Sequence, residues 1–181
     1  MNAAIRNAAT FLALTLGIAC ASAPENQPEQ DALQLEVEAT LDQMKAKDPS
    51  LQDVLASSAG YAVFPKIGEG AFIAGVTSGV GIVYDAAGNP MGNVEMRGGS
   101  IGAQIGGQSY SQVIIFQTQA ALTDFQRDDF EFSTDASATA LDMGASARLS
   151  FESGVAVIVD NENGLMAEAS LDGQKYDYQS I

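Results

Sequence analysis

The chain has 181 residues, 46% of them hydrophobic and 17% charged, which is enough for one globular domain with a short appendage. Its 23 acidic and 8 basic residues give a formal net charge of −15, and no basic cluster is present that could follow a phosphate backbone. The chain has no histidine and one cysteine, which excludes imidazole-based catalytic triads and histidine-ligated metal or haem sites. The composition therefore argues against nucleic-acid binding and against most hydrolase and oxidoreductase mechanisms.

Residues 1–19 are typical of a bacterial export signal. Arg6 lies in a short positive region, and residues 8–19 form an apolar stretch that is too short to span a bilayer comfortably. Cleavage could follow the small residues at 19–21, or fall just before Cys20, which would then be lipidated. Both alternatives predict an exported, periplasmic protein, and lipidation of Cys20 would in addition anchor it to the outer membrane.

Residues 20–31 are predicted to be a flexible tether, because their second part contains two prolines and no aliphatic residue. The folded domain is expected over residues 32–181. Apolar residues spaced by four, four and three predict an amphipathic helix over residues 31–47. Asp48 as N-cap and Pro49 at the first helical position predict a second short helix that ends near Ser58. Together these two segments predict a helical hairpin.

The rest of the chain is predicted to be mostly β-structure, since 17 of the 18 glycines lie beyond residue 59 and the segments between them are short and β-branched. The expected strands are 61–64, 71–77, 81–85, 93–97, 100–106, 112–117, 145–151, 154–159, 165–171 and 175–178. Asn163-Gly164 and Asp172-Gly173 favour hairpin turns, so the pairing is expected to be mainly antiparallel.

Two continuous apolar runs, 113–116 and 155–159, predict strands that are covered on both faces and that mark the centre of the core. Between them, residues 118–128 predict a third helix with Thr118 as its N-cap. The expected fold class is therefore α+β, with an N-terminal helical hairpin packed on a bent, mainly antiparallel sheet or partial barrel and with one inserted helix.

The order of the glycine-punctuated segments resembles a known family. The segments are GYAVFPK at 60–66, GAFIAG at 70–75, GGSIGAQIGGQS at 98–109, FEF at 130–132 and NGLMAEASLDG at 163–173. In this order, over residues 32–179, they resemble the SYLF domain, also called the Ysc84-type lipid-binding domain. The resemblance implies a non-enzymatic domain without a cofactor that associates with lipid head groups. It also implies phosphoinositide binding in eukaryotic members and actin binding in some fungal ones.

This sequence departs from the eukaryotic pattern in its charge. Eukaryotic members are thought to use a basic N-terminal helix against anionic membranes, whereas the first helix expected here is acidic. The basic residues beyond it are scattered along the chain, at Lys66, Arg97, Arg127, Arg148 and Lys175. Five dispersed cations, each contributing roughly 1 kcal/mol near an anionic surface, cannot offset the acidic balance. Phosphoinositides and actin are therefore poor candidate partners for this chain.

The candidate lipid-binding residues are Phe64, Lys66, Phe72 and Arg97, which could form an edge of aromatic rings and cations that meets a lipid head group. The alternative is that both phenylalanines belong to the core, because the alternation around them is that of half-buried strands. Among these residues Lys66 is the best cation to test, since it lies in the most family-like segment.

Two other motifs carry little functional weight. Residues 98–102 match G-x-S-x-G, but the chain has no histidine base and the segment is predicted to continue as a strand, so a serine hydrolase is not supported. Residues 160–164 resemble the start of a calcium loop, but the later ligands are missing and a hairpin turn explains them better.

The sequence therefore favours a non-enzymatic lipid-binding module of the bacterial cell envelope, whose expected partners are membrane lipids and, secondarily, a protein of the envelope. A structural or protein-interaction role in the periplasm, without a specific lipid ligand, is the alternative. No nucleic acid, metal or cofactor is expected as a ligand.

Overall fold

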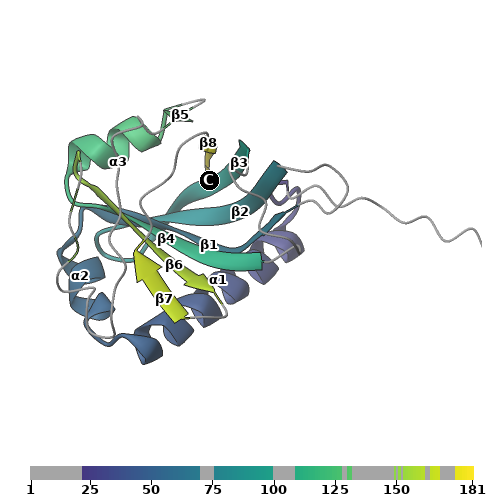
Figure 1. Ribbon diagram of the computed structural model, residues 1–181. Helices are drawn as coiled ribbons and strands as arrows, with labels where there is room; N and C mark the ends of the chain where they lie inside the picture. Colours follow the sequence, from purple (N-terminus) through teal and green to yellow (C-terminus); the bar gives the residue numbers. More distant parts are fainter. Residues whose placement is uncertain are drawn as a thin grey trace, which may run out of the picture.

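The computed structural model describes residues 22–69, 76–99, 109–127, 130–131, 149, 151, 153–161, 164–167 and 174–181. It has the expected α+β arrangement (Figure 1): two N-terminal helices pack on one face of a curled antiparallel sheet, and a third helix packs on the other face.

Helix α1 (Gln27–Lys47) begins four residues earlier than its apolar spacing predicted. The Asn26 side chain accepts a hydrogen bond from the Glu29 amide at 3.1 Å, and Pro28 lies in the first turn, so the cap and a pre-set φ start the helix here. Residues 27–31, which the composition had assigned to the tether, are therefore helical. Lys45 and Lys47 lie in the last turn, where they complement the helix dipole as expected.

The N-terminal end of α1 is held against strand β3 (Pro90–Gly99) by polar contacts. The Ala23 amide donates a hydrogen bond to Glu95 Oε1 at 2.7 Å. One turn into the helix, the Gln30 and Asn93 side-chain amides exchange two hydrogen bonds of 3.1 and 2.7 Å. The segment before the helix is thus attached to the sheet rather than extended away from it.

Helix α2 (Leu51–Ser57) follows α1 closely and completes the predicted helical hairpin. It begins at Leu51, two residues after the predicted position. The Asp48 carboxylate accepts hydrogen bonds from the Ser50 amide at 3.0 Å and the Ser50 hydroxyl at 2.6 Å, so these residues form the turn that precedes the helix.

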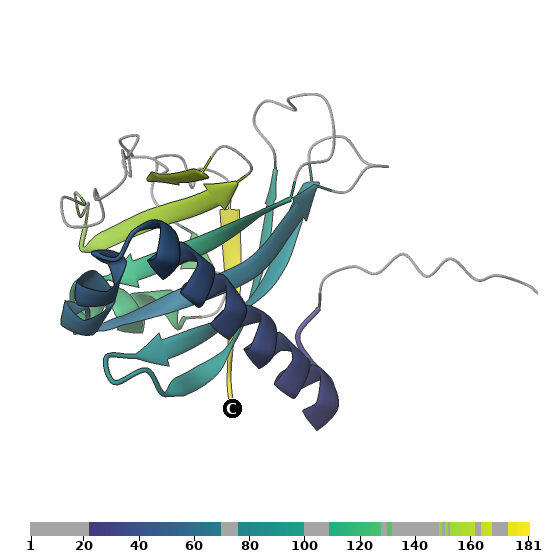
Figure 2. The same cartoon turned by 90° about the horizontal axis from the view of Figure 1, so that it is seen from below.

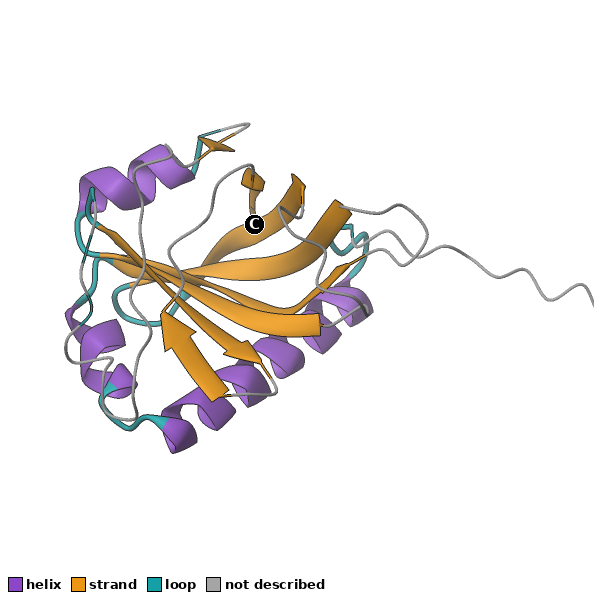
Figure 3. Ribbon diagram, in the orientation of Figure 1, coloured by secondary structure: helices purple, strands orange, loops and turns teal. Residues whose placement is uncertain are grey.

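The sheet has eight strands in the described part of the chain, and every pairing is antiparallel. The strand order is β5-β8-β3-β2-β1-β4-β6-β7. The strands not yet bounded are β1 (Gly60–Glu69), β2 (Val76–Asp85), β4 (Ser109–Phe116), β5 (Phe130–Glu131), β6 (Val155–Asn161), β7 (Gly164–Ala167) and β8 (Gln174–Ser180). Coloured by secondary structure, Figure 3 shows how the sheet separates the inserted helix from the N-terminal pair.

The two apolar runs, in β4 and β6, are covered on both faces, as predicted, and these strands are the sixth and seventh of the eight in the strand order. In β4, Val113 and Ile115 face the N-terminal helices, whereas Ile114 and Phe116 belong to the core on the opposite face. The apolar residues of β6 divide in the same way between the two clusters. The larger aromatic cluster, on the face away from α1, contains Phe64, Phe116, Phe125, Phe130 and Tyr176.

Helix α3 (Gln119–Phe125) confirms the predicted inserted helix and its cap. The Thr118 hydroxyl oxygen accepts a hydrogen bond from the Ala121 amide at 3.2 Å. Leu122 and Phe125 are buried against the sheet on the face away from α1. The helix therefore closes one end of that apolar layer.

The sequence was wrong to divide residues 71–85 into two strands, because β2 runs without a break from Val76 to Asp85. Gly79, in the predicted break, and Gly81, which follows it, allow β2 to pack closely against β1. A Cβ atom on Gly81 would overlap the Val63 carbonyl oxygen and would lie 2.9 Å from Phe64 Cδ1.

The β6–β7 hairpin is confirmed, but its turn is shifted by one residue. Asn161 pairs with Gly164, so Gly164 belongs to the strand rather than to the centre of the turn. The predicted strands 100–106 and 145–151, the first part of 71–77, the end of 165–171 and the turn at 172–173 lie outside the continuously described residues.

We predict that Gly81→Ala lowers the free energy of unfolding by about 1–3 kcal/mol, because the added methyl group must displace backbone and Phe64. Gly68→Ala is the matched control, since a Cβ atom on this β1 glycine meets nothing within 4 Å and should change stability by less than about 0.5 kcal/mol. Urea denaturation followed by circular dichroism measures both. Equal effects of the two substitutions would contradict the close approach of β1 and β2.

Two tyrosines stack beneath α1. The rings of Tyr61 and Tyr84 lie 5.2 Å apart at an interplanar angle of 17°. The Tyr84 hydroxyl is buried and has no hydrogen-bond partner among the described residues. Burial, reinforced by the neighbouring Tyr61 and Glu38, raises the pKa of Tyr84 to about 12.

We predict that the free energy of unfolding falls as pH rises from 10 to 12. In this window the unfolded chain loses the Tyr84 proton, whereas the folded chain keeps the neutral phenol, so deprotonation favours unfolding. Tyr84→Phe should reduce this loss, and at pH 7 it should leave stability unchanged or raised, because it removes an unpaired buried hydroxyl. Urea denaturation of both proteins at pH 7 and at pH 12 tests this. A large loss of stability in Tyr84→Phe at pH 7 would contradict the prediction, because it would show that the fold needs the hydroxyl.

Candidate functional site

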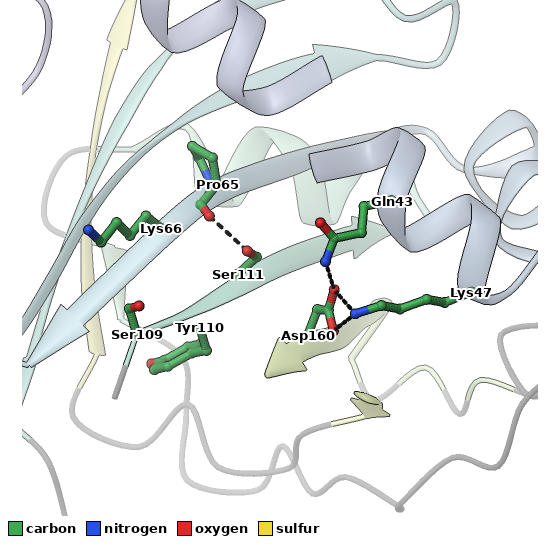
Figure 4. Close-up of a pocket in the computed structure, with 8 residues that line it drawn as sticks. All are labelled: Gln43, Lys47, Pro65, Lys66, Ser109, Tyr110, Ser111 and Asp160. Carbon is green, nitrogen blue, oxygen red and sulfur yellow. Dashed lines mark hydrogen bonds and ion pairs between the residues drawn. The ribbon is translucent and has the colours of Figure 1, made fainter. Parts of the chain in front are cut away.

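A groove lies between the C-terminal half of α1 and the sheet (Figure 4). It has a volume of about 550 Å³, and its lining is mostly polar. It is lined by Gln43, Lys47, Pro65, Lys66, Ser109, Tyr110, Ser111 and Asp160. The helix supplies two of these residues and strands β1, β4 and β6 supply the others, so the groove forms where the polar ends of the strands emerge beside α1.

One end of the groove is closed by an ion pair between helix and sheet. Lys47 Nζ contacts the two Asp160 carboxylate oxygens at 2.6 and 2.8 Å, and Gln43 Nε2 donates to Asp160 Oδ2 at 3.1 Å. The Asp160 side chain is only 3% exposed, so it depends on these donors to offset the cost of burial. Gln43 and Lys47 are one turn apart on α1, which places both on the flank that faces β6.

The other end of the groove carries Lys66, and an irregularity of β1 determines where its side chain lies. The pairing of β1 shifts between Val63 and Lys66, so Phe64 enters the apolar core on one face while Lys66 reaches the face occupied by α1. The Ser111 hydroxyl donates a hydrogen bond to the Pro65 carbonyl at 2.7 Å, which ties β4 to this irregularity. Figure 4 shows Lys66 and Ser109 grouped at this end, away from Asp160.

The groove is locally positive although the protein is strongly acidic. Lys47 and Lys66 contribute two positive charges and Asp160 one negative charge, which leaves +1 in a chain of −15. Lys66 is exposed and forms no ion pair with any residue in the described ranges. An exposed ammonium group without a carboxylate partner is available to an anion from solution.

The neighbouring groove along the N-terminal half of α1 has the opposite character. It has a volume of about 490 Å³ and is lined by Glu25, Glu29 and Glu36, together with Ser22, Pro24, Ala32, Leu33 and Val80. Because three carboxylates line it, an anionic ligand would be repelled there. Of these two grooves, the one near the C-terminal end of α1 carries the cations and is the better candidate for an anionic ligand.

The structure separates the four predicted lipid-binding residues. Phe64 is fully buried in the core, as the alternative interpretation proposed, so its ring does not form part of a lipid-contacting edge. Phe72 and the predicted lipidation site Cys20 lie outside the described residues. Lys66 lines the groove. Arg97 is exposed on β3, where its guanidinium is paired with Glu95.

The strand register places three cations that are scattered in the sequence on the same face of the sheet, although not in one site. Lys66 pairs with Val80, which pairs with Glu95, and Arg97 lies two residues farther along β3 on the same face of the sheet. Arg97 in turn pairs with Lys175 of β8. All three cations thus lie on the α1 face, whereas Arg127 follows α3 on the opposite face and Arg148 is outside the described residues.

The sequence did not identify the residues that complete the groove, namely Gln43, Lys47, Ser109, Tyr110, Ser111 and Asp160. The available signal was Asp160 itself, a carboxylate directly after the apolar run 155–159. A charge at the end of a buried strand requires a nearby partner, but the sequence did not show that this partner lies 113 residues earlier.

Among the described residues, no cluster of three or more Asp, Glu or Cys side chains could hold a metal ion. No helix in the same ranges is long and apolar enough to cross a membrane.

Comparison with known proteins supports the family resemblance. Residues 97–180 match the family model named Ysc84, described as a Las17-binding protein actin regulator. Over these residues the chain resembles the Ysc84 family. The Ysc84 match includes the groove residues of β4 and β6, whereas those of α1 and β1 precede it.

A second similarity extends over a longer part of the chain. Over 130 residues the chain is 26% identical to beta cell expansion factor A of Aeromonas veronii. This match covers 72% of the present chain and 49% of the relative, so the chain spans about half the length of that protein.

We predict that Lys47→Met lowers the free energy of unfolding by about 1–3 kcal/mol, because the buried Asp160 carboxylate loses its ammonium partner. The control is Arg127→Met, which breaks an exposed ion pair with Asp124 and should cost less than about 0.5 kcal/mol. Chemical denaturation of the three proteins measures the difference. A similar small loss for both variants would mean that Asp160 does not depend on Lys47.

Proposed function

We propose that the protein is a non-enzymatic lipid-binding module of the bacterial cell envelope, which associates with membrane lipid head groups. The observation that carries the proposal is Lys66, an exposed cation without an ion-pair partner in the described residues, at the end of a groove with a local charge of +1. The resemblance of residues 97–180 to the Ysc84 family supports a binding role, because the family description names a binding protein and no reaction.

The groove is better suited to binding than to catalysis. Its one carboxylate, Asp160, is 3% exposed and engages Lys47 and Gln43 with both oxygens, so it is poorly placed to accept a proton from a substrate. Lys66 stands apart from this pair (Figure 4). A cation beside hydroxyl groups can hold a phosphate without any reaction.

The proposed location follows from the N-terminal sequence. Residues 1–19 would direct export, and lipidation of Cys20 would attach the protein to the outer membrane. In this arrangement the groove would add head-group contacts to an attachment that the acyl chains already provide.

A protein partner is the second candidate. The family description names Las17 binding, which is a protein interaction, and the acidic groove beside Glu25, Glu29 and Glu36 offers a surface for a basic segment. A partner of this kind would leave the protein without affinity for lipid vesicles.

We predict that the full chain carrying Cys20→Ser, which prevents acylation, co-sediments with vesicles containing anionic phospholipid, more strongly at low salt than at physiological salt. In this background Lys66→Glu should lower the association constant by roughly fivefold or more, because it replaces the groove's unpaired cation with an anion. Arg127→Glu is the matched control, since it changes an exposed cation on the opposite face of the sheet.

Equal losses for Lys66→Glu and Arg127→Glu would show that binding reflects total charge rather than the groove. Absence of binding to vesicles of every composition would contradict the lipid-binding proposal and favour the protein partner.

A further inference from the structure

We infer that the groove selects a singly charged phosphodiester head group that carries uncharged hydroxyls, as in phosphatidylglycerol. This inference rests on the proposed lipid-binding function and names its ligand.

The phosphodiester would lie at the Lys66 end. Lys66 supplies the unpaired ammonium group, and Ser109 lies toward the same end of the groove (Figure 4). Phosphate oxygens prefer charge-assisted donors of this kind. One unpaired cation matches one negative charge, whereas a head group with several phosphates would bring excess negative charge into a protein of −15.

The remainder of the head group would extend toward the Lys47–Asp160 pair. The two charges of this pair cancel, and the Asp160 oxygens already accept hydrogen bonds from Lys47 and Gln43. A head-group ammonium placed here would approach the Lys47 ammonium, which is 37% exposed, and would be repelled. Uncharged hydroxyls avoid this repulsion and can hydrogen-bond to the polar lining.

The dimensions and the surroundings are consistent with such a ligand. A volume of about 550 Å³ lies within the range of small-molecule sites and accommodates a glycerol phosphodiester. The neighbouring groove with its three glutamates cannot share an anionic head group, so the ligand is restricted to the Lys66 end. The bilayer would then lie against the face of the sheet that carries α1. Figure 2 shows strands of the sheet extending past this helix, and the bilayer would lie on that side.

The test compares vesicles of equal surface charge. The full chain with Cys20→Ser is mixed with phosphatidylcholine vesicles that contain either phosphatidylglycerol or phosphatidylserine, both of net charge −1, the second with an added ammonium and carboxylate. We expect affinity for the phosphatidylglycerol vesicles to be about fivefold higher, and Lys66→Gln to abolish this preference. Arg127→Gln should retain it. Equal affinity for the two vesicle types would overturn the inference and leave general membrane binding intact.

A second experiment, with a soluble ligand and no vesicles, tests the groove independently of the membrane. Glycerophosphoglycerol, the head group without acyl chains, should protect Lys66 from chemical acetylation in the folded protein, and inorganic phosphate at the same concentration should protect it several-fold less. Lys66-specific protection without binding to any vesicle would support the head-group site while contradicting the membrane role. Equal protection by inorganic phosphate would overturn the head-group selectivity, because it would show a site for any small anion.

Discussion

Burial of strand β4 on both faces is the constraint on which the rest of the molecule depends. Its residues alternate between the apolar layer beneath α1 and the aromatic layer beneath α3, so helices must cover both sides of the sheet. The apolar rows end near Ser111 of β4 and Asp160 of β6, which are register partners. The groove forms at this boundary, where the sheet continues past the helix but its side chains have become polar.

The same boundary explains why the groove residues come from distant parts of the chain. Asp160 is buried at the end of an apolar strand, and its charge can be tolerated only with close donors, which α1 provides through Gln43 and Lys47. The pair thereby fixes the C-terminal half of the helix over β6. Lys66, in contrast, has no such structural task in the described part of the chain, and this difference separates a cation that stabilises the fold from one that is available to a ligand.

Periodicity predicted the elements of the fold better than their ends. The four-residue spacing in α1 and the continuous runs of β4 and β6 identified the helix and the two strands that are buried on both faces, because burial acts directly on those patterns. The start of α1 was misplaced since the cap Asn26 lies in a segment whose prolines suggested an extended tether. Residues 78–80 were predicted to interrupt β2, although Gly79 and the following Gly81 permit close approach to β1, a relation that only the paired strands reveal.

The sequence predicted one of the residues that line the candidate site. Lys66 was selected from a family-like segment and lies in the groove, whereas Phe64, its neighbour in sequence, is buried on the other face. Simple alternation would place both on one face, and the irregularity between Val63 and Lys66 changes this relation. The remaining lining residues depend on strand order and on the position of α1, which a single sequence does not determine.

The hydrogen bond from the Ala23 amide to Glu95 limits how far the segment before Ala23 can extend from the domain. Ala23 is the third residue after Cys20, so an extended chain between them would span at most about 10 Å. An acyl group on Cys20, or a fusion partner placed at that position, would consequently be held beside β3 and its Arg97. Such an attachment would limit rotation of the domain and present the same side of the sheet to whatever surface holds the chain.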